Sequence, residues 1–387
     1  MTTFISAMSS ISESLLMGRV NMVICSLNCL RILAALALMI TPSLLNGNSA
    51  LRAEKSLSAF PILMYDTDIG LGYGARVKFV DYLKRKESFD LIVFNSTKGE
   101  RWYVFAFSIP DIEIRQGKRY SFSFDIKAEY DKLLQSNFFG IGPDSSEEDL
   151  TNFTFEKKEL QLALGRGFSS SFALQGSYVF RNIRYFDVQE GTFNQELESV
   201  GEQFSPFFSL LLRYDTSDSQ IHPKRGIRFE FQNDFAADFL GNKNAAFHRF
   251  SLDFRTYNLL FGNQDVLAFR ILLQKISGTD IPLYELSVIG GCSTQDALRG
   301  YQMNRFQDRG KLLTNLEYRF PLWKRLGGNV FVDAGSVWPS FSRIDLQQFS
   351  VAAGWGLRYY LRDFCARFDM GFSREGLGIY FNFNHVF

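Results

Sequence analysis

The sequence is poor in the residue types that most catalytic and metal sites need. It has 3 histidines and 4 cysteines among 387 residues, and His222, His248 and His385 lie far apart along the chain. No HExxH or GxSxG motif occurs, and GLGYG (70–74) lacks the Lys-Ser/Thr of a phosphate-binding loop. The sequence therefore predicts no catalytic residues, no metal site and no cofactor.

An excess of charge of one sign is also lacking. The 42 Lys and Arg residues nearly balance the 41 Asp and Glu residues. No basic patch interleaved with aromatic residues is present, so the sequence gives no reason to expect nucleic acid as a partner. The mean hydropathy is slightly negative, which disfavours a bundle of membrane helices. It agrees with membrane strands, because their alternation of apolar and polar residues lowers the mean hydropathy.

Long apolar runs are scarce, and residues 32–45 (ILAALALMITPSLL) form the clearest one. Its length is typical of the hydrophobic region of a signal peptide and is short for a membrane-spanning helix. We expect residues 1–50 to be a leader, with translation starting at Met17 or Met22 as an alternative, and residues 51–387 to be the mature domain. An uncleaved membrane anchor is the competing interpretation.

Two of the four cysteines, Cys25 and Cys29, belong to the predicted leader and leave with it. Cys292 and Cys365 remain. The first lies in a long predicted loop, and the second lies near a predicted strand end on the side away from that loop. This placement disfavours a disulfide between them.

Phenylalanine is abundant, with 41 residues, and from about Phe60 onward the chain alternates apolar and polar residues in short segments separated by turn residues. Such alternation predicts strands with one apolar and one polar face. We count about sixteen strands, the first being the short segment Phe60–Tyr65 and the last Gly376–Phe387. An even number is expected of a bacterial single-chain membrane barrel.

The connections between these strands differ in length in a regular way. Even-numbered connections are short, whereas the long segments Leu133–Asn152, Gln189–Ser205 and Gly278–Gly310 are all odd-numbered. Short periplasmic turns and long extracellular loops give this asymmetry. The sequence thus predicts an all-β fold, a transmembrane antiparallel β-barrel. An ordinary sandwich with an apolar terminal strand is the alternative.

Charged residues lie on one face of two neighbouring predicted strands. Glu317 and Arg319 share a side of 311–323, and Asp333 lies on one side of 329–338, while Leu316 and Val332 lie on the opposite sides. A long loop carrying Arg299 precedes both strands. A guanidinium can bind two carboxylates at once, so Arg299 can join Glu317 and Asp333 inside the barrel. Two alternatives are that Arg299 is a solvated loop charge and that the two carboxylates are an acid–base pair.

The order GG…LRGY…LEYRFPL…VFVDAG resembles the C-terminal part of the BamA/TamA family of outer-membrane barrels, the bacterial surface antigen family. The resemblance implies that Arg299, Gly300 and Tyr301 form the tip of the sixth extracellular loop, which folds into the lumen. It also implies that the arginine contacts acidic residues of the wall, by position Glu317 and Asp333.

Three further segments resemble parts of the same family. NFFGIGPDSS (137–146) is similar to its FxGxG segment, and RYDTSDSQIHPKRG (213–226) is similar to its Asp…Pro-x-x-Gly periplasmic turn. The last strand resembles the aromatic C-terminal signal for barrel assembly, carried here by Phe381, Phe383 and Phe387. His385 takes a position where an aromatic residue is usual. By alternation these four residues share one face.

The resemblance implies a role in outer-membrane protein insertion or in polypeptide translocation through a weak seam between the first and last strands. Pro61 in a short first strand fits such a seam. Only Leu51–Ser58 separates the leader from the first strand, so we expect no POTRA module, and a separate periplasmic protein is one expected partner. Outer-membrane lipids and the barrel assembly machinery, during the protein's own insertion, are the other expected partners. The alternatives are a passive, loop-plugged pore, a structural or lipid-handling surface barrel, and a barrel-embedded hydrolase.

Overall fold

A computed structural model of the chain describes residues 55–66, 70–220, 222–242, 245–260, 264–360, 365–383 and 385–387. The predicted leader, with its alternative starts Met17 and Met22, its apolar run 32–45 and both of its cysteines, lies outside these ranges. None of the helices within the ranges has the length and hydrophobicity that crossing a membrane requires.

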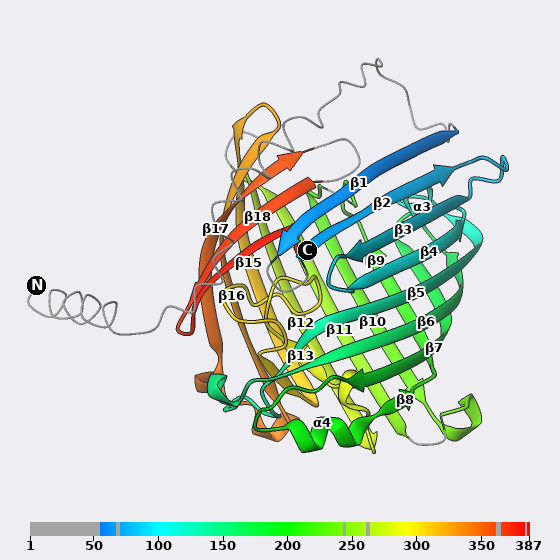
Figure 1. The fold of residues 1–387 in the computed structure, drawn as a ribbon. Coiled ribbons are helices and arrows are strands. Elements are labelled where there is room, and N and C mark those ends of the chain that lie inside the picture. The colour runs from blue at the N-terminus through cyan, green and yellow to red at the C-terminus, as the bar shows by residue number, and fades with distance from the viewer. Residues whose placement is uncertain are drawn as a thin grey trace, which may run out of the picture.

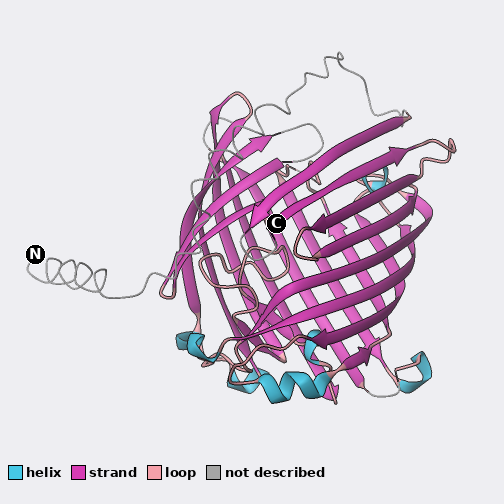
Figure 2. Cartoon of the chain, viewed as in Figure 1, coloured by secondary structure: helices cyan, strands magenta, loops and turns pink. Residues whose placement is uncertain are grey.

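One antiparallel sheet of 17 strands makes up most of the described chain and curves into a barrel (Figures 1 and 2). Its strands are β1 (Ser56–Asp66), β2 (Gly70–Val80), β3 (Ser88–Ser96), β4 (Arg101–Ile109), β5 (Tyr120–Phe138), β6 (Thr151–Gly167), β7 (Phe172–Phe186), β8 (Glu202–Phe204), β9 (Phe207–Asp215), β10 (Gly226–Ala236), β11 (Ala246–Leu259), β12 (Val266–Thr279), β15 (Gly310–Trp323), β16 (Leu326–Trp338), β17 (Ser350–Tyr360), β18 (Cys365–Ser373) and β19 (Gly376–Phe383).

The pairing follows chain order throughout. Each strand pairs with the next, except that the three-residue β8 and the longer β9 both pair with β7. Counting β8 and β9 as one interrupted strand gives sixteen barrel strands among the described residues. The predicted fold and approximate strand number are confirmed.

The two faces of the sheet differ as the alternation predicts. Apolar side chains such as Leu160, Leu162 and Leu164 of β6 are exposed on the outside, where lipid replaces water around a membrane barrel. Charged side chains such as Lys157 and Arg270 are buried on the inside. Lumen charge must find partners because an unpaired buried charge is costly, and this requirement shapes the site described below.

In the described part of the chain, the α-helices lie at the two ends of the barrel (Figure 2). At one end, α3 (Ile112–Arg115) follows β4, and the Asp111 carboxylate caps it by accepting from the Glu113 N–H at 3.0 Å. At the opposite end, α4 (Asn194–Val200) follows β7 (Figure 1). The short 3-10 turns at that end are η1 (Glu147–Asp149), η2 (Asp238–Leu240), η5 (Phe341–Arg343) and η6 (Leu346–Gln348). The short connections therefore share the α3 end and the long ones share the α4 end.

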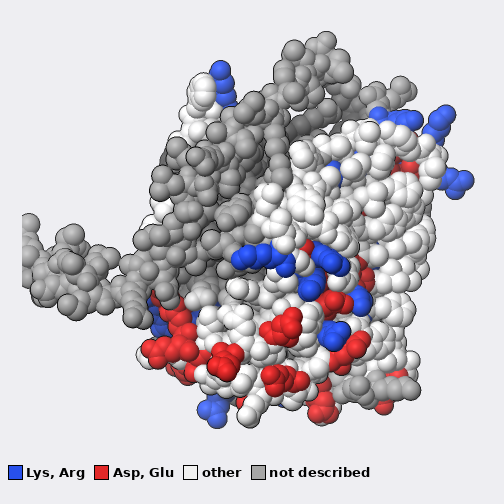
Figure 3. All heavy atoms as spheres, viewed as in Figure 1, with Lys and Arg blue, Asp and Glu red and all other residues white. Residues whose placement is uncertain are grey.

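Aromatic and charged side chains mark these two ends. Trp323 is exposed beside the turn that follows β15, and Phe239 is exposed in η2 at the α4 end. Lys84, Arg85 and Lys86 are exposed in the β2–β3 turn. In Figure 3, Lys and Arg residues lie at the upper right, above a largely uncharged region. Most of the visible Asp and Glu residues lie toward the lower rim. Aromatic residues at both margins of an apolar band are typical of a membrane barrel.

The first strand is longer than predicted. Instead of Phe60–Tyr65, β1 runs from Ser56 to Asp66 and pairs with β2 over all eleven residues, with Pro61 opposite Ala75. The prediction of a short strand was wrong because Pro61 does not interrupt the pairing. Proline is tolerated in edge strands, and β1 has such an edge, since no ladder among the described residues joins it to β19.

Candidate functional site: the sixth loop inside the barrel

The sixth loop (residues 280–309) connects β12 to β15 and folds into the barrel. It contains η4 (Leu283–Glu285) and a small hairpin of β13 (Ser287–Ile289) and β14 (Phe306–Asp308). Its apolar residues pack with wall residues in one buried cluster: Leu272, Ile289, Leu298, Tyr301, Phe306, Leu313, Val337 and Ala352. The loop is therefore part of the protein core and not an exposed connection.

Glycine allows the loop backbone to fold on itself. Gly290 and Gly291 have φ of 132° and 77°, a region that side chains disfavour. A Cβ on Gly290 would lie 2.2 Å from the carbonyl oxygen of Gln302 and 2.7 Å from the Arg305 nitrogen. The two arms of the loop are thus pressed together at a point where only glycine fits.

Arg299 lies at the centre of an ionic network at the loop tip. Its Nε and Nη2 donate to the two carboxylate oxygens of Asp333 at 2.7 and 2.8 Å, and its Nη1 donates to Glu317 at 2.6 Å. The Arg299 backbone N–H also donates to Asp333, at 3.2 Å. All three side chains have no exposed surface. We call Arg299, Glu317 and Asp333 the loop lock.

The ring of Phe331 supports the guanidinium from one side. The centre of that ring lies 3.4 Å from Cζ of Arg299. A guanidinium over an aromatic face gains a cation–π attraction, which is larger when both groups are shielded from solvent. The structure thus brings together the arginine and the two acids that the alternation pattern singled out.

Charged residues of β15, β17 and β18 extend this network, and two of them, Arg358 and Asp369, were not found in the sequence. Arg319 donates to Glu317 at 2.8 Å, and Arg358 of β17 donates to Asp369 of β18 at 2.7 Å. Arg299 also lies 3.4 Å from Asp369. The signal for Asp369 and Arg358 was a charged residue inside a mostly apolar strand, and the sequence analysis did not use it.

Gly300 and Tyr301 attach the loop tip to the last two strands. Gly300 has φ of 107°, and a Cβ there would lie about 3.0 Å from the β18 backbone at Phe372. Its N–H donates to the Tyr380 hydroxyl of β19 at 2.9 Å, and that hydroxyl donates to the Tyr301 carbonyl at 2.9 Å. The loop tip therefore contacts β15, β16, β18 and β19.

A second ionic anchor lies at the base of the sixth loop. Glu285 of η4 accepts from Arg181 of β7 at 2.8 and 2.9 Å and from Arg249 of β11 at 2.7 Å. Burial alone would raise the pKa of Glu285, but Arg181 and Arg249 outweigh it and lower that pKa below its usual value. Sequence reasoning missed Glu285 because its loop has no periodicity.

The FxGxG-like segment in the third loop contacts the sixth loop. The Arg305 guanidinium donates to Ser145 through Nη1 at 2.9 Å and Nη2 at 2.7 Å, and it lies 4.8 Å from the ring centre of Phe139. The Gly142 N–H donates to the Gln307 carbonyl at 2.8 Å. The two extracellular loops thus form one packed unit.

The C-terminal residues do not share one face as alternation predicted. Phe381 is exposed on the outer surface, and the Phe383 side chain lies outside the described residues, but His385 and Phe387 are buried. Since β19 ends at Phe383, period-two alternation does not continue. Arg319 donates to the Phe387 carbonyl at 2.9 Å.

An apolar cluster gives the tail its place inside the barrel. Phe387 and Val386 are buried together with Tyr257, Val266, Ala268 and Ala297. Because Ala297 belongs to the sixth loop, the tail and the loop share one packing unit. The expectation that Phe387 shares one face with Phe381 was wrong, because this cluster and Arg319 draw the tail inward.

Comparison with known proteins identifies the architecture. Residues 84–387 match the model of the Omp85 superfamily domain. BamA from Haemophilus ducreyi lacking POTRA domains 1–3 is similar in structure, with a TM-score of 0.60 and 15% identity over 86% of this chain and 70% of that chain. CdiB from Escherichia coli has a TM-score of 0.62 and 12% identity over 87% of this chain and 63% of that chain.

CdiB from Acinetobacter baumannii aligns with a TM-score of 0.52 and 14% identity, over 87% of this chain and 60% of that chain. A search among curated proteins found no match. At these identities the solved structures establish the fold alone. Together with the family match, they confirm the resemblance to BamA/TamA-type barrels and place the protein in the outer membrane. The chain belongs to the Omp85 superfamily.

Proposed function

We propose that this protein inserts or translocates polypeptides at the outer membrane, with the seam between β1 and β19 as the point of entry. The observation that carries the proposal is the absence of a β1–β19 ladder among the described residues, while every other neighbouring pair has one. Opening this seam breaks no backbone ladder in the described chain. An unpaired edge is a template on which another strand can pair.

The tip of the sixth loop makes the two sides of this seam unequal. On one side, β18 and β19 are held to the loop tip through Gly300, Tyr301 and Tyr380. On the other side, β1 pairs with β2 over eleven residues. We propose that the locked loop fixes the C-terminal side of the seam while β1 receives the client strand.

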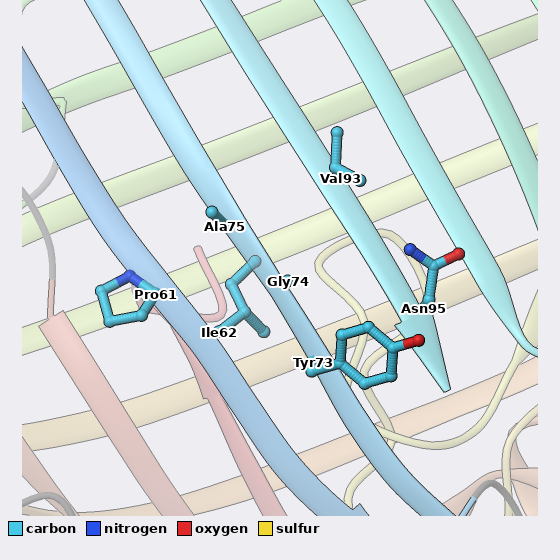
Figure 4. Close-up of a pocket in the computed structure, with 7 residues that line it drawn as sticks. All are labelled: Pro61, Ile62, Tyr73, Gly74, Ala75, Val93 and Asn95. Atoms are coloured by element: carbon cyan, nitrogen blue, oxygen red, sulfur yellow. The ribbon is translucent and has the colours of Figure 1, made fainter. Parts of the chain in front are cut away.

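The outer surface near the seam is apolar and open. A shallow hollow of about 520 Å³ lies over β1, β2 and β3, and Figure 4 shows the residues that line it: Pro61, Ile62, Tyr73, Gly74, Ala75, Val93 and Asn95. These lining residues offer no carboxylate, imidazole, ammonium or thiol. We propose that outer-membrane lipid fills this hollow and that the protein acts by transport, without catalysing a reaction.

Two protein partners follow from the same proposal. The barrel assembly machinery would insert this barrel itself, and Phe381, exposed near the end of β19, would belong to the signal it reads. A separate periplasmic protein would deliver the client to the α3 end. Co-purification of cross-linked periplasmic proteins with the folded barrel tests the second partner.

A reconstitution experiment tests the function. The full chain is folded into vesicles, and an unfolded outer-membrane barrel of another family is added as client. We expect faster client folding than in empty vesicles. A photo-cross-linking residue at Ala59 of β1 should capture the client, whereas the same residue at Leu210 of β9, also exposed, should not. Equal capture at both positions, or no acceleration, contradicts the proposal.

A loop-plugged passive pore is the second candidate, and the buried sixth loop favours it. Deleting residues 280–309 would then raise the conductance of the barrel in a planar bilayer. The pore interpretation requires this rise together with no effect of the wild-type barrel on client folding. The insertion proposal requires that the wild-type barrel speeds client folding, whether or not the deletion raises the conductance.

A further inference from the structure

Three potential metal ligands that are far apart in the sequence lie together at the α3 end of the barrel. They are His222 in the β9–β10 turn, Cys365 at the start of β18, and His385 after the end of β19. One ligand atom from each, an imidazole nitrogen or the thiol sulfur, lies within 4.8 Å of the other two. The rings of His222 and His385 have centres 5.8 Å apart and meet edge to face.

The turn that carries His222 is held by its own side chains. The Asp218 carboxylate accepts from the Lys224 N–H at 2.8 Å, and the His222 N–H donates to the Ser219 hydroxyl at 3.0 Å. Gly226 closes the turn with φ of 106°, where a Cβ would lie 2.4 Å from the carbonyl oxygen of Thr216. A turn fixed in this way presents His222 in a defined position.

The position of His385 is fixed from both sides. It lies between β19 and the buried residues Val386 and Phe387. The strand before it and the packed residues after it therefore hold the His385 ring beside His222.

Cys365 supplies a third ligand of a softer kind. Its side chain is fully buried and forms no disulfide within the described chain. The ring of Tyr360 packs against His222, with centres 4.9 Å apart, and closes one side of the cluster. A buried thiol beside two imidazoles is shielded from oxidants in solution while it remains close to both nitrogens.

We infer that His222, Cys365 and His385 form a binding site for a divalent cation of the zinc type at the periplasmic end of the barrel. Two nitrogens and one sulfur are the ligand set that Zn²⁺ prefers, and a water molecule can take the fourth tetrahedral position. Zinc–ligand bonds of about 2.0 to 2.3 Å place neighbouring ligand atoms roughly 3.3 to 3.8 Å apart. A cation therefore draws the three atoms together by about 1 Å, within the range of side-chain rotation.

Such a site has a structural consequence for the seam. The bound cation links the tail after β19 to the β9–β10 turn and to β18. Binding would hold the tail in its buried position and thereby support the C-terminal strand. The sequence predicted no metal site because these residues have no ligand spacing, and only the barrel topology brings their strand ends together.

Cobalt spectroscopy tests the ligands directly. The full chain, with Cys25 and Cys29 changed to Ser, is folded in detergent and titrated with Co²⁺. We expect one equivalent to bind with a thiolate-to-cobalt charge-transfer band and the visible bands of a tetrahedral ion. C365S removes the charge-transfer band, whereas C292S keeps it. A spectrum without that band in the parent protein overturns the inference.

Zinc affinity provides the second measurement and uses the third histidine as a control. H385A should weaken Zn²⁺ binding by more than about tenfold, since even the loss of a group that only supports a ligand costs this much. H248A should bind as the parent does, because His248 lies in β11 and its ring bonds to Asn233. Each variant is first shown to be folded by gel electrophoresis, in which a folded barrel migrates differently before and after boiling. Equal affinity in H385A and H248A contradicts the site.

Discussion

Removing Arg299 should release the sixth loop. In R299A, the Asp333 carboxylate loses both side-chain hydrogen bonds from the guanidinium. It keeps the bond from the Asn315 side chain at 2.8 Å and the weaker one from the backbone N–H of residue 299 at 3.2 Å. Glu317 is less affected because Arg319 still donates to it at 2.8 Å. Most of the cost therefore falls on Asp333, a fully buried charge that no other guanidinium contacts directly in the described network.

The size of the effect follows from this geometry. Breaking a buried ion pair by removing one partner costs about 3 to 5 kcal/mol. If that free energy appears as opening of the loop, the open population rises by roughly two to four orders of magnitude. R299K keeps the charge but not the planar fork, so we expect a smaller loss of about 1.5 to 3 kcal/mol, the worth of one charged hydrogen bond.

Limited trypsin digestion measures the opening. Arg305 lies in the loop and is 2% exposed in the folded protein, so cleavage after it reports release. We expect R299A to be cut much faster than wild type. The double variant R299A/D333N should recover part of the resistance, because it removes the unpaired charge. R374A is the matched control, since the Arg374 side chain is 67% exposed in the β18–β19 turn. Equal resistance of R299A and R374A would refute the reasoning.

Three further predictions concern the loop anchors and the last strand. The contribution of Glu285 to stability is complete above its usual pKa of 4.5 and declines as the pH falls through its lowered folded-state pKa. In E285Q, the temperature at which the folded barrel changes its gel mobility should therefore depend less on pH in the acid range. An unchanged pH profile contradicts this. G371A should speed loop cleavage, because its Cβ would lie 2.6 Å from the Arg299 backbone, whereas G176A, whose Cβ would meet only the Phe208 ring at 3.3 Å, should not. F381S should slow assembly in cells without lowering the resistance of the folded barrel to protease, and normal assembly kinetics would argue against a role for Phe381 in the signal.

The alternation of residues predicted the faces of the barrel wall well, for a physical reason. A strand with lipid on one side and charge on the other tolerates no change of register. Glu317 is buried while Leu316 is exposed, and Asp333 is buried while Val332 is exposed. Both acids therefore could be placed in the lumen from the sequence alone.

Features that depend on three-dimensional proximity could not be predicted in this way. Asp369 joins Arg299 only because β18 curves round to face the loop tip. Glu285 meets Arg181 across 104 residues, and no local pattern indicates that contact. The inward course of Phe387 was missed because alternation carries no information once the strand has ended.

The loop lock also bears on the order in which the barrel can be built. Arg299 binds Glu317, Asp333 and Asp369, which lie 18, 34 and 70 residues further along the chain, whereas Arg305 reaches back 160 residues to Ser145. Closing the longest of these chain segments costs about 1 kcal/mol more in entropy than closing the 34-residue one.

The sixth loop and the five strands after it can therefore form a nucleus from local contacts alone. The third loop can dock onto that nucleus when β5 and β6 arrive. The strand β1, whose outer edge joins no ladder among the described residues, can be placed last. On this scheme the residues that hold the loop inside the finished barrel are also the residues that start its assembly.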